Sequence, residues 1–431
     1  MLTHVLLASL LIGGPAQDAQ DGPRKLTVTD AISAALESNA DIQIAVEGER
    51  QSAAKTQEQR SALLPNFTGT AGYVNQTINL GAQGLNLRGI PSKIGPFGTS
   101  TLQMQFNEPV IDIGLIRQYR AVKQAGATSK FETETVRNRV AAMVADLYFN
   151  AQRARAQVEA EKAQIELDER LLKLAQDRKG AGVGTGLDVT RASAQLAVER
   201  RHWIEAQNAV RTADLRLLRA MGESPDKQIT LDDSGCNPFE EPKNLGAAID
   251  EALRFRPEMK AEENKVQVAH LNVSSTQAER LPSIRAIANY GNTGNTSLFI
   301  PTDAVGLQLT LPLFDGGLRS AHRAMAASQT RQAETRRRDV HDEIEVEVRI
   351  AVDNLTSARE QLTAANETLK LAEEEIEQAQ LRFEAQVTTQ IDVVDAQARL
   401  AQARSSQVNA VYGVRAAEVE FLRATGKSVS N

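Results

Sequence analysis

The sequence predicts a mainly α-helical fold with a small β part, built as two copies of one unit. Aromatic residues make up only 4% of the 431 residues, and such a composition with helical periodicity is typical of long helices and coiled coils. A turn between two long helical patterns carries Leu187-Asp188-Val189, and about 204 positions later it recurs as Ile391-Asp392-Val393. One turn present twice between long helices predicts a duplicated rod.

The first 19 residues have the pattern of a secretory signal peptide. An apolar run from Val5 to Ile12 is followed by small residues, although the preceding segment carries His4 and no lysine or arginine. The alternative is a short buried apolar segment. No later run of 18 apolar residues occurs, so we expect no transmembrane helix in the rest of the chain. The single cysteine, Cys236, allows neither an intramolecular disulfide nor a metal cluster.

The first unit is predicted to span residues 20–222. Thr29 or Asp30 can cap an opening helical pattern that continues to about Leu64, where Pro65 stops it. Strands are expected at about 66–76 and 100–108, and Pro109 is expected to end the second strand. A long helix at about 115–179 follows, about 100 Å at 1.5 Å per residue. A second helix at about 188–221 completes the unit.

Residues 223–243 are predicted to form a linker, after which the same plan restarts. The second unit, 244–427, is expected to hold strands at about 283–291 and 303–313, a long helix at about 318–385 and a helix at about 392–424; residues 428–431 form a tail. The offset between the units changes from 217 at Tyr73 and Tyr290 to 203 at Gly114 and Gly317. About 14 extra residues therefore belong to the first hairpin loop, where insertions are tolerated.

The predicted strands alternate apolar and polar residues, which is the period of a half-buried strand. The apolar face could pack on helices in an aqueous protein, or face lipid in a transmembrane barrel whose lumen is lined by polar side chains. Four strands cannot close a barrel, so membrane insertion would require several chains to share one; three chains would give 12 strands. The candidate lipid-facing residues are Phe67, Tyr73, Leu102, Met104, Phe106, Ile284, Tyr290, Val305, Leu307, Leu309 and Leu311.

The order and spacing of these features resemble the outer-membrane efflux protein (TolC) family over about residues 26–427. The resemblance is carried by the two-fold repeat, by a P-strand-loop-strand-P-x-x-D-x-G pattern and by the turns G-x-x-x-x-LDV and V-x-x-x-IDVVDA. It implies a homotrimer with a 12-stranded barrel in the outer membrane and a long coiled-coil α-barrel in the periplasm. It implies a passive exit duct for a tripartite efflux pump or type I secretion system, partnered by an inner-membrane transporter and a periplasmic adaptor.

The resemblance assigns roles to two groups of residues beyond the strands. The two turns would be the periplasmic tips where the adaptor docks, while Asp188 and Asp392 are also expected to act as N-caps of the following helices. Glu374 and Glu377, three apart on one helical face, would ring the lumen and select cations, although such a charge run is often only a solvated face. The tip residues are Val183, Gly184, Thr185, Gly186, Leu187, Asp188, Val387, Thr388, Thr389, Gln390, Ile391 and Asp392.

Enzyme chemistry is not indicated. The glycine-rich run at 180–186 lacks the Lys-Ser/Thr of a phosphate-binding loop and follows a helix rather than a strand. The five histidines show no metal-ligand spacing, and we expect no cofactor. The modest net charge of −6 argues against a nucleic-acid partner. The alternative function is a soluble periplasmic coiled-coil scaffold or adaptor, in which the strands would pack against protein.

Overall fold

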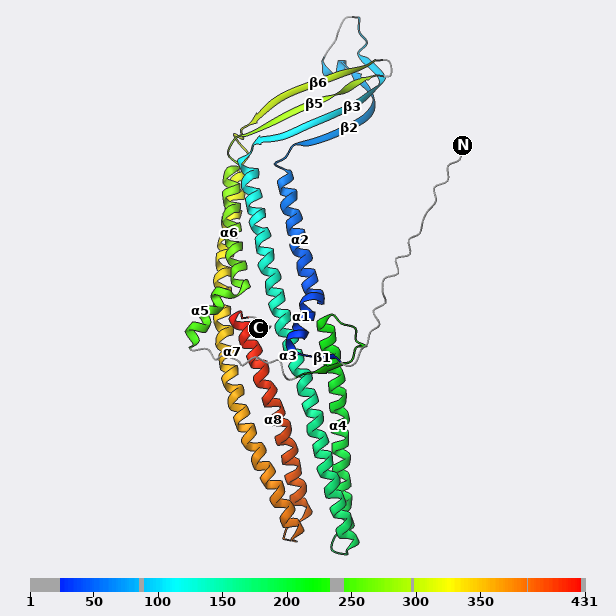
Figure 1. Ribbon diagram of the computed structural model, residues 1–431. Coiled ribbons are helices and arrows are strands. Elements are labelled where there is room, and N and C mark those ends of the chain that lie inside the picture. The colour runs from blue at the N-terminus through cyan, green and yellow to red at the C-terminus, as the bar shows by residue number, and fades with distance from the viewer. Residues whose placement is uncertain (1–23, 85–88, 233–243, 296–297, 386, 428–431) are drawn as a thin grey trace, which may run out of the picture.

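The computed structural model describes residues 24–84, 89–232, 244–295, 298–385 and 387–427. The predicted signal peptide, Cys236 and the tail 428–431 lie outside these ranges. Figure 1 shows a long rod with a β-sheet at one end, helical hairpin tips at the other and short helices near the middle. No helix in these ranges contains a stretch that is both long and apolar enough to cross a membrane.

The first repeat begins with two helices where the sequence predicted one continuous pattern. Helix α1 (Val28–Ser38) and helix α2 (Ala40–Ser61) are separated at Asn39, so the expectation of one helix to about Leu64 is wrong. The cap of α1 is Thr27, with Asp30 as its capping-box partner, rather than Thr29 or Asp30 itself. Asn39 adopts an extended backbone, caps α2 and donates a 2.8 Å hydrogen bond from its amide to the carbonyl of Ala220. This contact fixes the break against the end of the repeat.

Four antiparallel strands form the sheet in the order β2-β3-β5-β6. They are β2 (Asn66–Asn79), β3 (Lys93–Ile111), β5 (Ser283–Asn295) and β6 (Leu298–Thr310), longer than expected except at the end of β6. Pro109 does not end β3, as the sequence suggested: it lies within the strand and pairs with Arg285. The β2 ladder stops at Asn107, so that side of β3 is already free at Pro109, where proline is tolerated.

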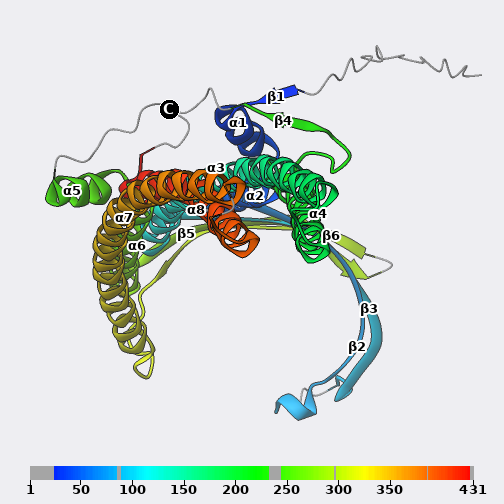
Figure 2. The ribbon, with the colours of Figure 1, turned by 90° about the horizontal axis from the view of Figure 1, so that it is seen from below.

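Long helices carry the rest of the chain. Helix α3 (Ile113–Gly180) and helix α4 (Gly186–Met221) form the first arm; helix α7 (Leu318–Glu384) and helix α8 (Gln390–Thr425) form the second. Helix α5 (Leu245–Phe255) and helix α6 (Pro257–Ala278) correspond to α1 and α2. Contacts place the helices side by side as α2–α3–α6–α7 near the sheet and α4–α3–α8–α7 near the tips. Viewed along the rod, the helices follow an arc and the sheet is strongly curved (Figure 2).

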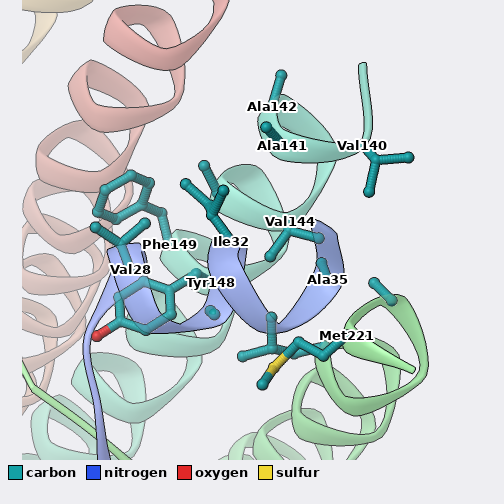
Figure 3. Close-up of a cluster of buried hydrophobic side chains, with 14 of the residues drawn as sticks. Val28, Ile32, Ala35, Val140, Ala141, Ala142, Val144, Tyr148, Phe149 and Met221 are labelled. Atoms are coloured by element: carbon teal, nitrogen blue, oxygen red, sulfur yellow. The ribbon is translucent and has the colours of Figure 1, made fainter. Parts of the chain in front are cut away.

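The repeats are anchored by equivalent apolar clusters near the middle of the rod. In the first, Ile32 of α1 and Leu217 of α4 pack on α3 beside Tyr148 and Val144, all fully buried; Figure 3 shows the side chains of α1 and α3 interlocking there. In the second, α5, α7 and α8 form the matching cluster around Ile344 and Val348. Burial of such side chains contributes about 1.5–3 kcal/mol each, so these clusters hold the arms together.

A small parallel sheet was not predicted. Strand β1 (Arg24–Leu26) pairs with strand β4 (Ile229–Leu231), which lies inside the expected linker 223–243. The Tyr148 hydroxyl lies 2.7 Å from the carbonyl oxygen of Leu26 and 2.6 Å from that of Asp232. Three-residue strands are too short to show a period, so the sequence carried no signal for them. The sheet ties the start of the chain and the linker to α3.

Replacing Gly222 by alanine is expected to lower the stability of the fold. Gly222 ends α4 with a φ of +73°, and an added Cβ would lie 2.6 Å from the Ser38 carbonyl oxygen. The left-handed backbone and the overlap together cost roughly 2–5 kcal/mol. Gly48→Ala is the matched control, because Gly48 lies in α2 with nothing within 4 Å. Thermal unfolding should show a lower midpoint for Gly222→Ala only; equal midpoints would contradict the assignment.

Candidate functional site: the arm tips and the sheet faces

The first tip is a tight turn between α3 and α4. The amides of Val183 and Gly184 both donate to the carbonyl of Arg178 at 3.0 Å, and Gly182 has a φ of +77°. A Cβ on Gly184 would lie 2.9 Å from the backbone nitrogen of Lys179. Gly184 therefore allows the chain to fold closely over the end of α3, and the neighbouring Val183 is exposed.

A capping box starts the helix after the first tip. Thr185 is the N-cap: its hydroxyl accepts from the Asp188 amide at 3.2 Å, while its own amide and hydroxyl donate to Asp188 Oδ2 at 2.9 and 2.7 Å. The prediction that Asp188 is the N-cap is thus wrong by three residues, because Asp188 occupies the third helical position. The hydrogen bonds from Thr185 lower the pKa of Asp188, so this carboxylate stays charged at neutral pH.

The second tip uses the same construction without a glycine turn. Thr389 is the N-cap of α8, and its amide and hydroxyl both donate to Asp392 Oδ2 at 3.1 Å. The Thr388 hydroxyl also donates to Asp392, and these bonds lower the pKa of that carboxyl. As at the first tip, the N-cap is the threonine, and the predicted cap Asp392 is its partner.

Two contacts join the tips to each other. The guanidinium of Arg178 lies 4.3 Å from the centre of the Phe383 ring and donates to the Phe383 carbonyl at 2.6 Å. Gln390, which is buried, donates from its side-chain amide to the Asp188 carbonyl at 2.9 Å. Arg178 and Phe383 were missed by the sequence analysis; their only signal is that each stands in the last turn of a long helix. The tips therefore form one joined surface at the end of the rod (Figure 1).

Apolar side chains point outward from this surface. Val183, Leu187, Val387 and Ile391 are 48% to 68% exposed. Valine, leucine and isoleucine gathered in the open at the end of a helical rod are typical of a protein-contact surface. A turn that only closes a helical hairpin normally has polar residues, because exposing apolar side chains to water is unfavourable. The four exposed apolar residues therefore support the interpretation of the tips as a docking surface.

The sheet brings together ten of the eleven predicted lipid-facing residues on one face. Phe67 pairs with Phe106, Met104 pairs with Tyr290, and Ile284 pairs with Leu309, so the alternation of all four strands is in phase. The exception is Leu311: β6 ends at Thr310, because Pro312 cannot donate to a ladder. Most of this face is exposed in the single chain, Val305 to 87%.

The opposite face of the sheet is polar. It carries Gln103 and Gln105 of β3, paired with Thr70 and Thr68 of β2, and Gln308 of β6, paired with Arg285. A curved sheet with one apolar and one polar face separates two environments of different polarity. The sequence predicted both faces, because side chains alternate between the two faces of a strand whether or not the chain assembles with other copies.

Glu374 and Glu377 lie on α7, away from both tips and from the sheet. Both are exposed, whereas Ala372 and Ile376 of the same helix are buried against α3 and α8. Glu375, which belongs to the same acidic run, forms an ion pair with Arg399 of α8. The two predicted selectivity residues therefore point away from the packed side of their own arm.

The fold defines a class: a duplicated chain with paired helical arms, joined tips and a two-faced sheet open at both edges. Comparison with known proteins identifies the group within that class. The sequence model of the outer membrane efflux protein family matches residues 31–223 and 248–427. Because these ranges cover most of the chain, the protein belongs to the outer membrane efflux protein family.

Relatives and solved structures agree with this membership. The chain is 28% identical to the alkaline protease secretion protein AprF of Pseudomonas aeruginosa over 259 residues, 58% of this chain and 52% of AprF. It is 24% identical to the outer membrane efflux protein BepC of Brucella suis, over 99% of this chain and 91% of BepC. The Campylobacter jejuni CmeC outer membrane channel superposes with a TM-score of 0.81 at 20% identity, covering 93% and 85% of the chains.

Family membership decides several predictions. Membership of an outer membrane family places the chain at the outer membrane, as predicted, and does not support the soluble scaffold alternative. The mainly helical fold with four antiparallel strands is confirmed. The match to AprF spans only about half of that relative's length, so substrates and partners are argued below as proposals.

Proposed function

We propose that this chain is one third of a passive outer-membrane exit duct, serving a tripartite efflux pump or a type I secretion system. The observation that carries the proposal is the two-faced sheet at one end of arms about 100 Å long. The apolar face of the sheet contacts lipid, and its polar face lines a water-filled bore. The arms continue the bore through the periplasm to the joined tips.

Free edges support assembly from copies of this chain. The sheet ends in β2 on one side and β6 on the other, and unpaired edges are not tolerated in lipid. Pairing β6 of one copy with β2 of the next satisfies both edges and closes a ring. Channels of this family form homotrimers, and three copies give a 12-stranded barrel. The helices have matching free edges: α2 and α4 on the β2 side, α7 on the β6 side.

An apolar stripe on α7 fits this assembly. The large apolar side chains of α7 that are exposed, each by 53% to 59%, recur at spacings of 7, 21, 4, 21 and 10 residues. Such spacings place them at two positions of one heptad repeat, the pattern of a coiled-coil seam. No helix of the same chain covers this stripe within the described ranges, so a neighbouring copy is its natural partner. The α7 stripe consists of Leu318, Met325, Val346, Ile350, Leu371 and Leu381.

The joined tips are proposed to dock a periplasmic adaptor that links the duct to an inner-membrane transporter. The exposed valine, leucine and isoleucine side chains of the tips offer apolar contacts of the kind that helical hairpins bury in one another. Arg178 and Gln390 support the proposal indirectly, because they hold both tips in one geometry. The transporter supplies the energy, since the proposed duct has no enzymatic site of its own.

Neutralising Glu374 and Glu377 together is expected to lower the cation preference of the duct. Glu374 shares a heptad position with Leu381 of the α7 stripe, so it lies at the proposed seam between copies, and Glu377 lies almost one turn further along α7. Three copies would bring six such carboxylates to the seams that border the bore, and such rings concentrate cations. Glu374→Gln with Glu377→Gln should move the reversal potential under a salt gradient towards zero and weaken block by multivalent cations in planar bilayers. Asp342→Asn, an exposed position higher on α7 and outside the two heptad positions of the α7 stripe, is the control. Unchanged reversal potential and block in the double variant would exclude this pair as the selectivity ring.

Fractionation separates the duct from the scaffold alternative. A protein with a barrel in lipid should remain in the outer-membrane pellet after carbonate extraction and require detergent for release. Release of the full-length protein by carbonate would contradict the proposal. The orientation of the sheet can be tested on intact cells with Ser92→Cys, which lies in the β2–β3 connection. A thiol label that does not cross membranes is expected to react with this cysteine from outside the cell.

A further inference from the structure

A buried carboxylate lies where the first arm meets the second. Asp168 of α3 is 1% exposed and contacts α8. Its Oδ1 atom accepts hydrogen bonds from the side-chain amides of Gln397 of α8, at 2.6 Å, and Gln164 of α3, at 3.1 Å. Its Oδ2 atom is buried and has no hydrogen-bond partner within the described residues. Leaving a charged oxygen in this state costs several kcal/mol, so the site is unfavourable for an ionised carboxylate.

The neighbouring charges do not neutralise Asp168. Glu199 of α4, 5% exposed, is a like charge that faces it, and Gln195 donates to Glu199 at 2.8 Å. On α8, Arg404 donates to the Gln164 amide oxygen at 3.4 Å rather than to the carboxylate. Helix α7 contributes the apolar Ala372 and Ile376 to the adjoining cluster. The remaining charged groups close to Glu199 are Glu161, Arg201 and His202.

Burial, with a smaller contribution from Glu199, raises the pKa of Asp168 to about 6, against the two amide hydrogen bonds that lower it. Burial likewise raises the pKa of Glu199. If the arms part and water reaches Asp168, its pKa returns towards 3.8. The packed arrangement then binds the proton more tightly than the parted one. The stability of the packed arrangement relative to the parted one is therefore highest at low pH, and it falls as the pH rises from about 4 to about 6.

We propose that Asp168, with Gln164, Gln397 and Glu199, forms a proton-operated lock between the two arms. When Asp168 is neutral, the buried oxygen that has no hydrogen-bond partner within the described residues no longer carries a charge, and the arms pack closely. When it is charged, the buried seam holds one unpaired carboxylate facing another, and the second arm separates more readily from the first. The lock acts through the seam between α3 and α8, and it does not depend on the proposed transport function.

The distance between the arms tests the proposal. Full-length protein in detergent, with Cys236→Ser, carries spin labels at Glu166→Cys on α3 and Gln402→Cys on α8, both exposed positions beside the lock. Pulsed electron–electron double resonance should give a narrow distance distribution at pH 4 and a broader or longer one at pH 8, with the change falling between about pH 4 and pH 6. Asp168→Asn should remove the shift and keep the narrow distribution at both pH values.

Two further variants make the result decisive. Glu169→Gln, the adjacent exposed position that pairs with Arg200, should titrate like the unsubstituted protein. Glu199→Gln removes the like charge, so less packing stability is lost when Asp168 ionises and the shift in the distance distribution should be smaller. This variant also tests the lock if Asp168→Asn fails to fold. An identical distribution at pH 4 and pH 8 in the unsubstituted protein, or a full shift retained by Asp168→Asn, would overturn the proposal.

Discussion

Replacing both Val346 and Ile350 by glutamate is expected to abolish assembly of the trimer. Both side chains belong to the α7 stripe and are about half exposed in the single chain. A neighbouring copy would bury them, and an unpaired buried charge costs several kcal/mol. At about 4 kcal/mol per contact the association weakens roughly a thousandfold, and each trimer contains three such contacts. Native mass spectrometry of the detergent-purified protein should detect trimers for the unsubstituted chain and monomers for Val346→Glu with Ile350→Glu.

A control on the same helix separates assembly from folding. Thr356→Glu lies about two turns beyond Ile350 on α7, is exposed and falls outside the two heptad positions of the α7 stripe. It should leave the trimer intact. Circular dichroism of both variants should retain the helical signal, since neither site contributes to the buried clusters of the chain. Trimers of normal stability in the double variant would show that the α7 stripe is not the copy–copy contact.

Replacing both Leu187 and Ile391 by glutamate is expected to abolish binding of the adaptor to the duct without damaging the channel. These side chains are exposed beside the caps of α4 and α8, so the substitutions leave the capping boxes in place. Loss of two central apolar contacts typically costs about 2 kcal/mol or more, roughly 30-fold in affinity. A photoreactive residue at Val183 should cross-link a periplasmic hairpin protein in native cells, and the double variant should lose that product.

The matching control adds charge one turn further along the arm. Ser193→Glu is exposed on α4 and does not touch the tip turn, so cross-linking from Val183 should persist. Channel conductance of the Leu187→Glu, Ile391→Glu variant should equal that of the unsubstituted protein. Undiminished cross-linking in the double variant would remove the tips from the docking surface.

The duplication and the strands were predictable because each rests on a simple period. The repeat of the LDV and IDV turns located both arms, and strict alternation at Leu102, Met104 and Phe106 placed the apolar face before any register was available. Long proline-free stretches set the helix lengths to within a few residues. The strand ends were less predictable, because a proline such as Pro109 stops a strand only where a neighbouring strand needs the amide hydrogen that proline lacks.

Features that depend on contacts between distant segments could not be predicted. The break at Asn39 is fixed by Ala220, and the parallel pair β1–β4 joins segments about 200 residues apart. Asp168 stands among many carboxylates of a helix rich in charge, and only the packing of α4 and α8 distinguishes it. The threonine caps could have been found, since T-x-x-D at Thr185 and Thr389 is a capping-box pattern.

Single-channel recording tests the central claim most directly. Purified trimers added to one side of a planar lipid bilayer should produce discrete, uniform conductance steps, because the 12-stranded barrel encloses a bore wider than that of an eight-stranded barrel. The monomeric Val346→Glu, Ile350→Glu protein at the same concentration should produce none. Absence of any conductance step from the unsubstituted trimer, at all voltages and after incorporation is verified, would contradict the account of this chain as an outer-membrane duct.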